Sequence, residues 1–559
     1  MSTEHTSGWT LPFSLGDHGL APAEREETLS GYRKYIEQQS KSFLGYQANQ
    51  HASYSKQLSW MLDHHVNNIG DPFTEGNFTI NSKAFERDVL DYFAELWHAT
   101  VPHRPDDGDS YWGYVLTMGS TEGNLYGLWN ARDYLRGRAL ILDPANPMRM
   151  LWVEATMPSE AGGVESSGED DLEDGVFRTD NAFTPVAFYS ADTHYSLTKA
   201  VRVLDIPTPR EIGNKRYRGK CPLGGPWPDE VPSLRGDGGP GSIDVDALCQ
   251  LVEFFASNGH PALVSLNAGT TFKGAYDPVA EIAPRIVKIM KDHGLYQRTV
   301  YLPNGMATER HGFWIHVDGA LGAAYLPYLR EAQRAGDPRV KHLPPIPEFD
   351  FAIEHVFSMA MSGHKWIGAP WPCGIYMTKT KYQLEPPDIP AYIGSPDTTF
   401  AGSRGGFSSV VLWEHLARYS HTEQVDRVIA AEQLTEYATD KLIELGKTHQ
   451  IDLKVARTPL ALTVRFRKPV DHLVFKYSLS TETFLSDPSF DYAHLFVMPG
   501  VIKELIDRLV DDLSQPGAFD EPAQPTFRAA LAAEAIGTAS TAPLFTAAKT
   551  VPLVGRGFH

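Results

Sequence analysis

The chain has 559 residues, with 50 Lys and Arg against 69 Asp and Glu, and therefore a formal net charge of -19. This acidic balance leaves no basic surface for nucleic acid or for an anionic membrane, so we exclude both as primary partners. A hydrophobic content of 42%, with 11% aromatic residues, is that of a globular protein and not of a disordered one.

Cysteine usage and the first residues indicate a cytoplasmic protein. The three cysteines, Cys221, Cys249 and Cys373, have no CxxC spacing, which argues against a disulfide framework and against a cysteine-based zinc site. We expect no metal. The N-terminal MSTEHTSGWT has neither the basic nor the apolar region of a secretory signal, and no uninterrupted apolar run reaches membrane-spanning length.

Residues 1–95 are predicted to form an N-terminal arm and a helical segment. A helical pattern begins at Ala23, and FERDVLDYFAELW has apolar residues at helical spacing. Between them lies the loop HHVNNIGDPFTEGNFTINS, which is too long and too polar to serve only as a connection. This loop contains Asn67 and Asn68.

Short apolar runs separated by helical or loop stretches predict a largely parallel sheet with crossover helices. They occupy residues 111–118, 151–158, 187–190, 262–267, 315–317 and 357–361. Ligands of such sheets bind at the carboxyl ends of the strands. Three of these ends carry candidate reactive groups, namely His194, Thr270 and Asp318.

The first run is followed by a candidate anion site. Gly119, Ser120 and Thr121 open a helix, where free N–H groups and the positive end of the helix dipole point at one spot. The same residues could equally be an ordinary helix N-cap.

Lys365, in AMSGHKWIG, lies between an apolar strand and an exit rich in glycine and proline. An amine in such a partly dry crevice has a lowered pKa and can attack a carbonyl. A lysine at the end of a buried strand could also be purely structural, so its partners decide the interpretation.

The chain from residue 379 onward is predicted to contain a long loop, the end of the large domain, a small C-terminal domain and a tail. Residues 379–403 form a loop rich in proline with Tyr392 in its middle, and helical patterns resume at about residue 409. A strand-like LALTVRFRK and an amphipathic VIKELIDRLVDDL indicate a small C-terminal α+β domain over 426–515, after a large α/β domain over 96–425. We interpret 159–179 as an acidic surface loop and 516–559 as a flexible tail.

A reactive lysine, an anion site at a helix N-terminus, a histidine and an aspartate together indicate one cofactor. Pyridoxal phosphate forms an imine with lysine, needs its phosphate held, and works best when a carboxylate keeps its ring nitrogen protonated. Asp318 suits the last role and His194 could stack on the ring. Each residue alone would more often be structural.

These residues belong to longer segments that resemble the group II pyridoxal-phosphate-dependent amino acid decarboxylases, in the branch of the bacterial histidine and plant serine decarboxylases. The matching segments are NNIGDPFTEGNFTINSKAFERDVLDYFAELW, GSTEGNLYGLWNAR, YSADTHYS, NAGTTFKGAYDPV, HVDGALGAAYLP, SGHKWIGAPWPCGIY and YIGSPDTTFAGSR. The resemblance implies fold type I, like aspartate aminotransferase: a mostly parallel seven-stranded sheet with helices on both faces, and a small C-terminal domain. It also implies a homodimer with the active site at the interface.

The resemblance also implies roles for single residues. Lys365 would bind the cofactor, Tyr392 on the mobile loop would return a proton after CO2 leaves, and His194 would stack on the ring. The cofactor would be held by Gly119, Ser120, Thr121, His194, Thr270, Asp318, Ala320, Ser362, His364 and Lys365. The substrate would meet Asn67, Asn68, Ser403, Arg404 and Phe407, with Tyr392, Ser403 and Arg404 reaching the neighbouring subunit's site.

The substrate is predicted from one difference between this chain and the family branch that it resembles. The branch usually has Gly-Ser-Arg-Asn-Gly-His, whereas this chain has Gly-Ser-Arg-Gly-Gly-Phe at 402–407. A buried polar side chain without partners is costly, so we favour a neutral apolar amino acid such as valine or leucine. The alternatives are a histidine, serine or aromatic substrate, an aldehyde synthase or transaminase reaction on the same cofactor, or a scaffold without activity.

Overall fold

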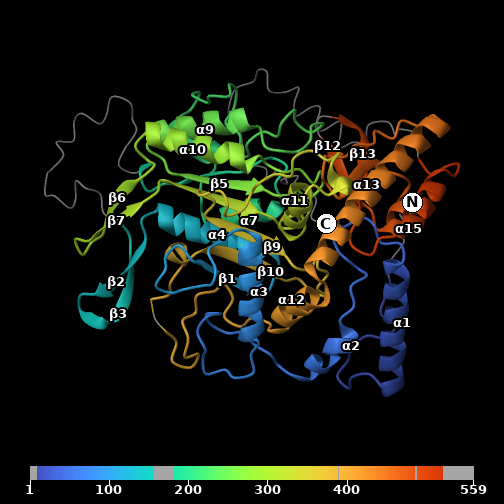
Figure 1. The fold of residues 1–559 in the computed structure, drawn as a ribbon, viewed down its shortest axis with the longest axis horizontal. Helices are drawn as coiled ribbons and strands as arrows, with labels where there is room; N and C mark the ends of the chain where they lie inside the picture. The colour runs from blue at the N-terminus through green and yellow to red at the C-terminus, as the bar shows by residue number, and fades with distance from the viewer. Residues whose placement is uncertain (1–8, 156–180, 388, 485–486, 520–559) are drawn as a thin grey trace.

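The computed structural model describes residues 9–155, 181–387, 389–484 and 487–519 (Figure 1). The acidic stretch at 159–179 and the tail beyond residue 519 lie outside these residues, so the predictions for them stay untested. Among the described helices, none combines the length and the apolar character that a membrane crossing requires.

The central sheet has six strands in the order β1-β10-β9-β8-β5-β4. β4, β5, β8 and β9 pair in parallel, and β10 is antiparallel to both of its neighbours, so β10 alone runs against the others. The strands are β1 (Tyr111–Leu116), β4 (Val186–Phe188), β5 (Ala262–Asn267), β8 (Phe313–Asp318), β9 (Ser358–Ser362) and β10 (Gly374–Lys379). Every residue of β1, β5, β8 and β9 is buried, as expected for a sheet covered on both faces.

The described sheet therefore has six strands and not the seven that we expected. Beside β4, the segment that follows α7 makes one ladder-like bond, from Ala187 N to Pro207 O. Pro207 and Pro209 carry no N–H group, so this segment cannot continue the ladder as a strand.

A second correction concerns residues 151–158, which we expected in the central sheet. They fall partly in β3 (Asn146–Val153), which among the described strands pairs with β2 (Ala139–Asp143) alone, in a separate hairpin. A similar hairpin, β6 (Arg298–Tyr301) with β7 (Ala307–Arg310), was not predicted. Both hairpins extend from the same side of the molecule (Figure 1).

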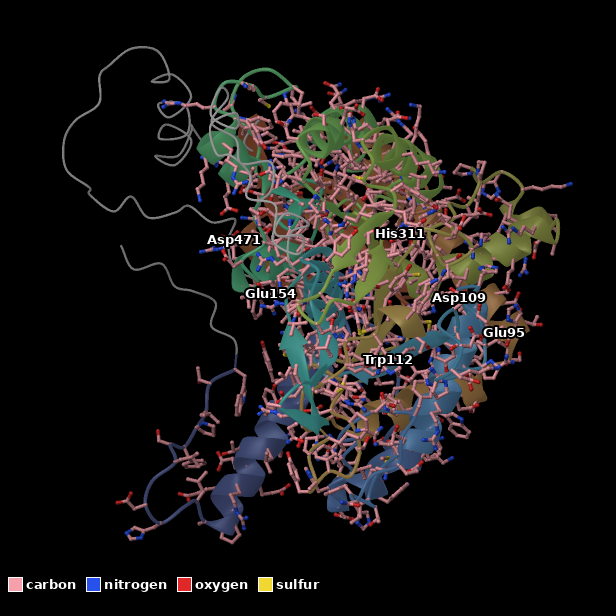
Figure 2. All side chains as sticks on the ribbon, turned by 90° about the vertical axis from the view of Figure 1, so that its left-hand side faces the viewer. Glu95, Asp109, Trp112, Glu154, His311 and Asp471 are labelled. Atoms are coloured by element: carbon pink, nitrogen blue, oxygen red, sulfur yellow. The ribbon has the colours of Figure 1, made fainter. Side chains whose placement is uncertain are left out.

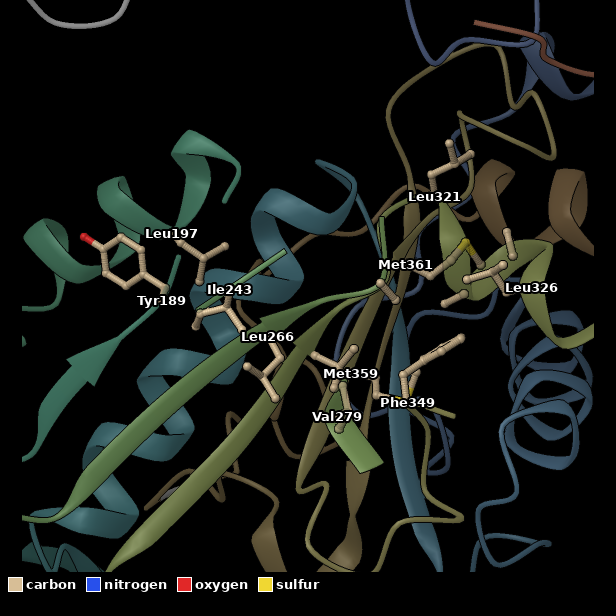
Figure 3. Packing of buried hydrophobic residues seen from close by; sticks show 14 of the residues in the cluster. Tyr189, Leu197, Ile243, Leu266, Val279, Leu321, Leu326, Phe349, Met359 and Met361 are labelled. Atoms are coloured by element: carbon tan, nitrogen blue, oxygen red, sulfur yellow. The ribbon is translucent and has the colours of Figure 1, made fainter. Parts of the chain in front are cut away.

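Helices cover both faces of the sheet. α4 (Ser120–Leu135) packs on β8, β9 and β10, and an added Cβ on Gly123 would lie 2.7 Å from the Ala360 Cβ, so only glycine permits this approach. Met359 points to the opposite face and shares the core with Val279 of α10 (Val279–Asp292) (Figure 3). The other helices of this part are α3 (Lys83–Leu96), α7 (Tyr195–Val203), α8 (Pro209–Arg216), α9 (Val245–Ser257), α11 (Leu326–Arg334) and α12 (Phe407–Arg418).

The C-terminal part contains the antiparallel sheet β11-β13-β12, with β11 (Thr463–Arg467), β12 (Ser480–Phe484) and β13 (Asp487–Phe496). Its helices are α13 (His421–His449), α14 (Asp471–Tyr477) and α15 (Lys503–Leu513). α13 packs on both α15 and β11. This arrangement has the α+β character that we predicted for this region.

The N-terminal helix α1 (Pro22–Ser40) stands away from the body of the molecule in two perpendicular views (Figures 1 and 2). It has no buried residue, although Leu29, Tyr32 and Ile36 are apolar and exposed. The short helices α2 (Ser55–Leu58) and η1 (Ser59–Asp63) follow it. A helix with an uncovered apolar face gains little stability within its own chain.

Candidate active site

The structure brings the predicted strand-end residues together. In the pairing register Asn267 of β5 lies opposite Asp318 of β8, which lies opposite Ala360 of β9. Lys365 follows three residues after β9, in a turn closed by a bond of 3.1 Å from Gly368 N to Gly363 O. The carboxyl ends of three parallel strands thus form the floor of the site.

Lys365 is half-buried, and its Nζ donates to Gln47 Oε1 at 2.7 Å. Gln47 Nε2 donates in turn to the carbonyl of Thr271 at 3.1 Å, so Gln47 links the lysine to the turn that follows β5. Burial lowers the pKa of Lys365 to about 8, and the negative charge of Asp318 opposes this shift. A substantial share of the amine is therefore neutral near physiological pH.

Gln47 was missed by our sequence reasoning. It lies 318 residues from Lys365 and outside the segments that carry the family resemblance. Asn49, two residues after Gln47, also contacts this region. The Asn49 backbone N–H donates to Lys365 O at 3.2 Å, and the Asn49 side chain donates to Trp366 O at 3.2 Å. The segment after α1 thus closes one side of the site, which only the folded chain reveals.

Asp318 is buried and incompletely paired. Its Oδ2 accepts from Asn124 Nδ2 at 2.8 Å, whereas its Oδ1 has no hydrogen-bond partner among the described residues. Burial raises the pKa of Asp318, while the charge of Lys365, the bond from Asn124 and a weaker backbone contact from the Ala320 N–H lower it. A buried carboxylate oxygen without a donor is costly, so this atom fits a cationic N–H group of a bound molecule.

The N-terminus of α4 forms a cradle between two loops. Gly119 has φ +66°, and a Cβ at this position would lie 2.5 Å from His364 Cε1, so the backbone there approaches His364 as only glycine allows. Ser120 N donates to Ser362 Oγ at 3.0 Å, and Ser120 Oγ is buried without a partner in the described part of the chain. Thr121 continues the first turn and is half-buried.

This cradle has the chemistry of an anion site. The nearest acidic side chain, Glu122, is turned back and accepts from Thr117 N at 2.6 Å and Met118 N at 3.0 Å. The positive end of the helix dipole and the unpartnered Ser120 Oγ therefore face the space that an anion would occupy. The pKa of His364 is lowered by burial and by Lys365, so its imidazole is largely neutral.

His194 caps α7 and is half-buried. Its Nδ1 lies 2.8 Å from Ser196 Oγ and 3.2 Å from Ser196 N. Burial, with the charges of Lys365 and Lys199, lowers its pKa to about 3, so the ring is neutral. The two remaining predicted neighbours are Thr270, which is buried with its Oγ1 accepting from Ala275 N at 3.0 Å, and the half-buried Ala320, whose carbonyl accepts from Ser362 N at 3.0 Å.

The residues predicted to contact substrate include two that the structure uses elsewhere. The Arg404 guanidinium is buried and forms an ion pair with Glu86, with a further bond of 3.0 Å to Gly70 O. Asn68 donates to Glu86 Oε2 at 2.9 Å and accepts from Ser82 N at 2.8 Å. Most polar atoms of Arg404 and Asn68 are thus paired within one subunit, whereas Arg404 Nε has no partner among the described residues, so their contact with substrate stays a prediction.

The other loop residues are more open. Asn67 Nδ2 donates to Ser403 Oγ at 3.2 Å, which ties the two predicted loops together. Phe407 begins α12, is half-buried, and its ring centroid lies 6.0 Å from that of Trp371, just after the Lys365 turn. The Tyr392 side chain is 77% exposed, on a loop held by the bond from Asn77 Nδ2 to Ala391 O at 3.1 Å.

The fold and the pattern of buried polar atoms are those of a pyridoxal-phosphate enzyme of fold type I. Residues 238–450 match the pyridoxal-dependent decarboxylase conserved domain. The chain is 46% identical to L-methionine decarboxylase from Streptomyces sp. 590, solved in an internal aldimine form, with a TM-score of 0.80 over 90% of this chain and 97% of that one.

Curated relatives agree with this similarity. Histidine decarboxylase of Solanum lycopersicum is 27% identical over 88% of this chain and 89% of its own length. Serine decarboxylase 1 of Oryza sativa subsp. japonica is 26% identical over 89% of this chain and 77% of its own length. The chain belongs to the pyridoxal-dependent decarboxylases, and it is an amino acid decarboxylase that depends on pyridoxal phosphate.

Proposed function

We propose that this decarboxylase converts a neutral, apolar L-amino acid into its primary amine and CO2, with Lys365 as the cofactor-binding lysine. The observation that carries the proposal is that one site contains both a half-buried amine of lowered pKa, on Lys365, and the buried carboxylate of Asp318, whose Oδ1 has no hydrogen-bond partner among the described residues. When bound, pyridoxal phosphate supplies an electron sink for the electron pair left by the departing carboxylate.

The residues present fit this cofactor. Asp318 Oδ1 would accept the N–H of the pyridine ring, and Ser120 Oγ at the positive N-terminal end of α4 would hold the phosphate. His194 and Ala320 would lie against the two faces of the ring. Gln47 would hold the free amine of Lys365 before the cofactor binds and again after the substrate amine has displaced it, because the Gln47 amide oxygen accepts from Nζ.

An apolar substrate is supported by two observations. Gly405 and Phe407 stand where the histidine and serine branch has an amide and an imidazole, so these two positions offer no polar partner to a polar side chain. The most extensive likeness described above is to an enzyme whose substrate, L-methionine, is also neutral and apolar. We therefore add methionine to valine and leucine as candidate substrates.

Self-association completes the proposal. α1 leaves Leu29, Tyr32 and Ile36 uncovered, and Tyr392 projects into solvent from its loop. A second copy of the chain would cover such a face and could receive the Tyr392 hydroxyl at its own site. There Tyr392 would return a proton to the carbon that has lost CO2, which gives the amine as product.

Release of CO2 from a panel of amino acids tests this function. We expect methionine, valine or leucine to exceed histidine and serine in kcat/KM by about a hundredfold, because a site without polar partners leaves a polar side chain unpaired. Amine should form in equal amount to CO2. Preference for histidine or serine would contradict the substrate assignment, and stoichiometric ammonia and peroxide would contradict the reaction.

The pKa of Lys365 predicts the pH dependence of cofactor uptake. The neutral amine is the nucleophile, so below pH 8 the rate at which the cofactor-free protein recombines with pyridoxal phosphate should rise about tenfold per pH unit and then level off. The folded chain also binds fewer protons than the unfolded chain between about pH 8 and 10.5, so this group's contribution to the unfolding free energy increases with pH across that window. A rate that still climbs about tenfold per unit near pH 9 would show an unperturbed lysine.

A further inference from the structure

Behind Asp318, a row of hydrogen bonds crosses the buried layer between α4 and the sheet. Trp314 Nε1 lies 3.0 Å from Ser358 Oγ, and the same oxygen lies 2.8 Å from His316 Nδ1. His316 Nε2 lies 2.9 Å from Asn124 Oδ1, and Asn124 Nδ2 donates to Asp318. All five side chains are buried.

Asp318 determines the direction of every bond in this row. An ionised carboxylate can only accept, so the Asn124 amide must turn its NH2 group toward Asp318 and its oxygen toward His316. His316 Nε2 then carries the ring proton, and His316 Nδ1 accepts a hydrogen bond from the Ser358 hydroxyl. Trp314 can only donate, and it fills one of the two lone pairs of Ser358, while the Tyr376 hydroxyl also bonds to this serine. Burial lowers the pKa of His316 to about 3, consistent with this neutral tautomer.

The same amide reaches a second active-site residue. Asn124 Nδ2 also donates to Ser196 Oγ at 3.0 Å. Ser196 therefore gives its own hydrogen to His194 Nδ1, which lies 2.8 Å away, and the Ser196 N–H points at the same nitrogen. The neutral His194 ring must then carry its proton on Nε2.

We propose that His316, Ser358, Asn124 and Ser196 are positioning residues that act as one unit: they hold Asp318 with its Oδ1 available and His194 as its Nε2–H tautomer. This inference rests on the proposed function, in which both residues face the cofactor. The tautomer of His316 is decisive. A proton on Nδ1 would leave Nε2 an acceptor, would favour the reversed Asn124 amide, and would set the amide oxygen against the Asp318 carboxylate.

Two substitutions of His316 distinguish loss of its hydrogen bond to Asn124 from a mere reduction in side-chain volume. His316→Gln can place an amide N–H near the position of Nε2 and so keep the bond to Asn124, whereas His316→Asn places its amide near Nδ1 and loses that bond. We expect His316→Asn to weaken binding of pyridoxal phosphate to the cofactor-free protein by about ten- to a hundredfold, the loss expected when the Asn124 amide turns and its hydrogen bond to the charged Asp318 is broken. His316→Gln should recover most of this affinity.

Ser358→Ala is a second test of the proposal, and Thr378→Val on the neighbouring strand β10 is its matched control. It removes the donor to His316 Nδ1, and we expect the same loss of affinity, a lower kcat with KM nearly unchanged, and a shifted pH titration of the bound cofactor's absorbance. Thr378, which pairs with Ser358 across β9 and β10, has a buried hydroxyl that donates to Phe357 O at 2.7 Å, and its only link to the row in the described residues passes through the Tyr376 hydroxyl. Thr378→Val should therefore leave cofactor affinity and spectrum unchanged.

The outcomes separate this inference from the proposed function. Each variant is first compared with the parent protein by thermal unfolding without cofactor, so that misfolding is scored independently. If the parent binds pyridoxal phosphate and decarboxylates, but folded Ser358→Ala and His316→Asn match it in affinity and absorbance, the positioning role is wrong. Equal losses in His316→Asn and His316→Gln would overturn it as well, because volume alone would then explain them. A parent protein that fails to bind the cofactor through Lys365 would refute the proposed function itself.

Discussion

Replacing Lys365 with alanine is expected to lower kcat at least about a thousandfold, because the substitution removes the amine that binds the cofactor covalently. The half-buried amine also donates to Gln47, so its loss opens the contact that joins the N-terminal segment to the site. Steady-state release of CO2 by the purified variant, saturated with pyridoxal phosphate, measures the effect.

Lys379 offers a matched control. It lies at the end of β10, is half-buried, and burial lowers its pKa as well. Lys379→Ala should keep activity within about a factor of three, since surface and edge substitutions rarely act on a distant site. Borohydride reduction followed by peptide mapping should place the cofactor on Lys365 alone, and a label on any other lysine would refute the assignment.

Asp318→Asn is expected to lower kcat about a hundred- to a thousandfold with a much smaller change in KM. The substitution keeps the size of the side chain but removes the negative charge that would hold a proton on the cofactor ring, a contribution comparable to one preorganised electrostatic contact in other sites. The absorbance of the bound cofactor should change together with kcat, which a purely structural role of Asp318 would not produce.

Asp277 is the control for burial. It is as buried as Asp318, but its carboxylate accepts from Ile243 N and Asn267 N, both at 2.7 Å, so it stabilises the loop after β5. Asp277→Asn should lower the free energy of unfolding and leave the cofactor spectrum of the folded protein unchanged. The reverse result, a normal spectrum in Asp318→Asn and a shifted one in Asp277→Asn, would move the ring contact to Asp277.

Much of the fold could be predicted because its strands are short, apolar and separated by helices. The predicted run at residues 262–267 coincides with β5, and the helix that opens at Ser120 is α4. β10 was missed because GIYMTK follows a stretch rich in glycine and proline, and its antiparallel direction has no local signal. The strand count failed where Pro207 and Pro209 interrupt pairing, which depends on a neighbouring strand as much as on the segment itself.

The candidate active site could likewise be predicted only in part. The sequence by itself determined the reactive groups and their order along the chain, because strand ends in a parallel sheet converge and their residue types are specific to one cofactor. Only the tertiary structure decided which polar atoms of the site have hydrogen-bond partners within the chain and which have none. It joined Gln47 to Lys365, buried Arg404 against Glu86, and placed Asn124 between Asp318 and His194. These contacts join residues far apart in the chain, and hydrogen-bond satisfaction there depends on distances that no local pattern encodes.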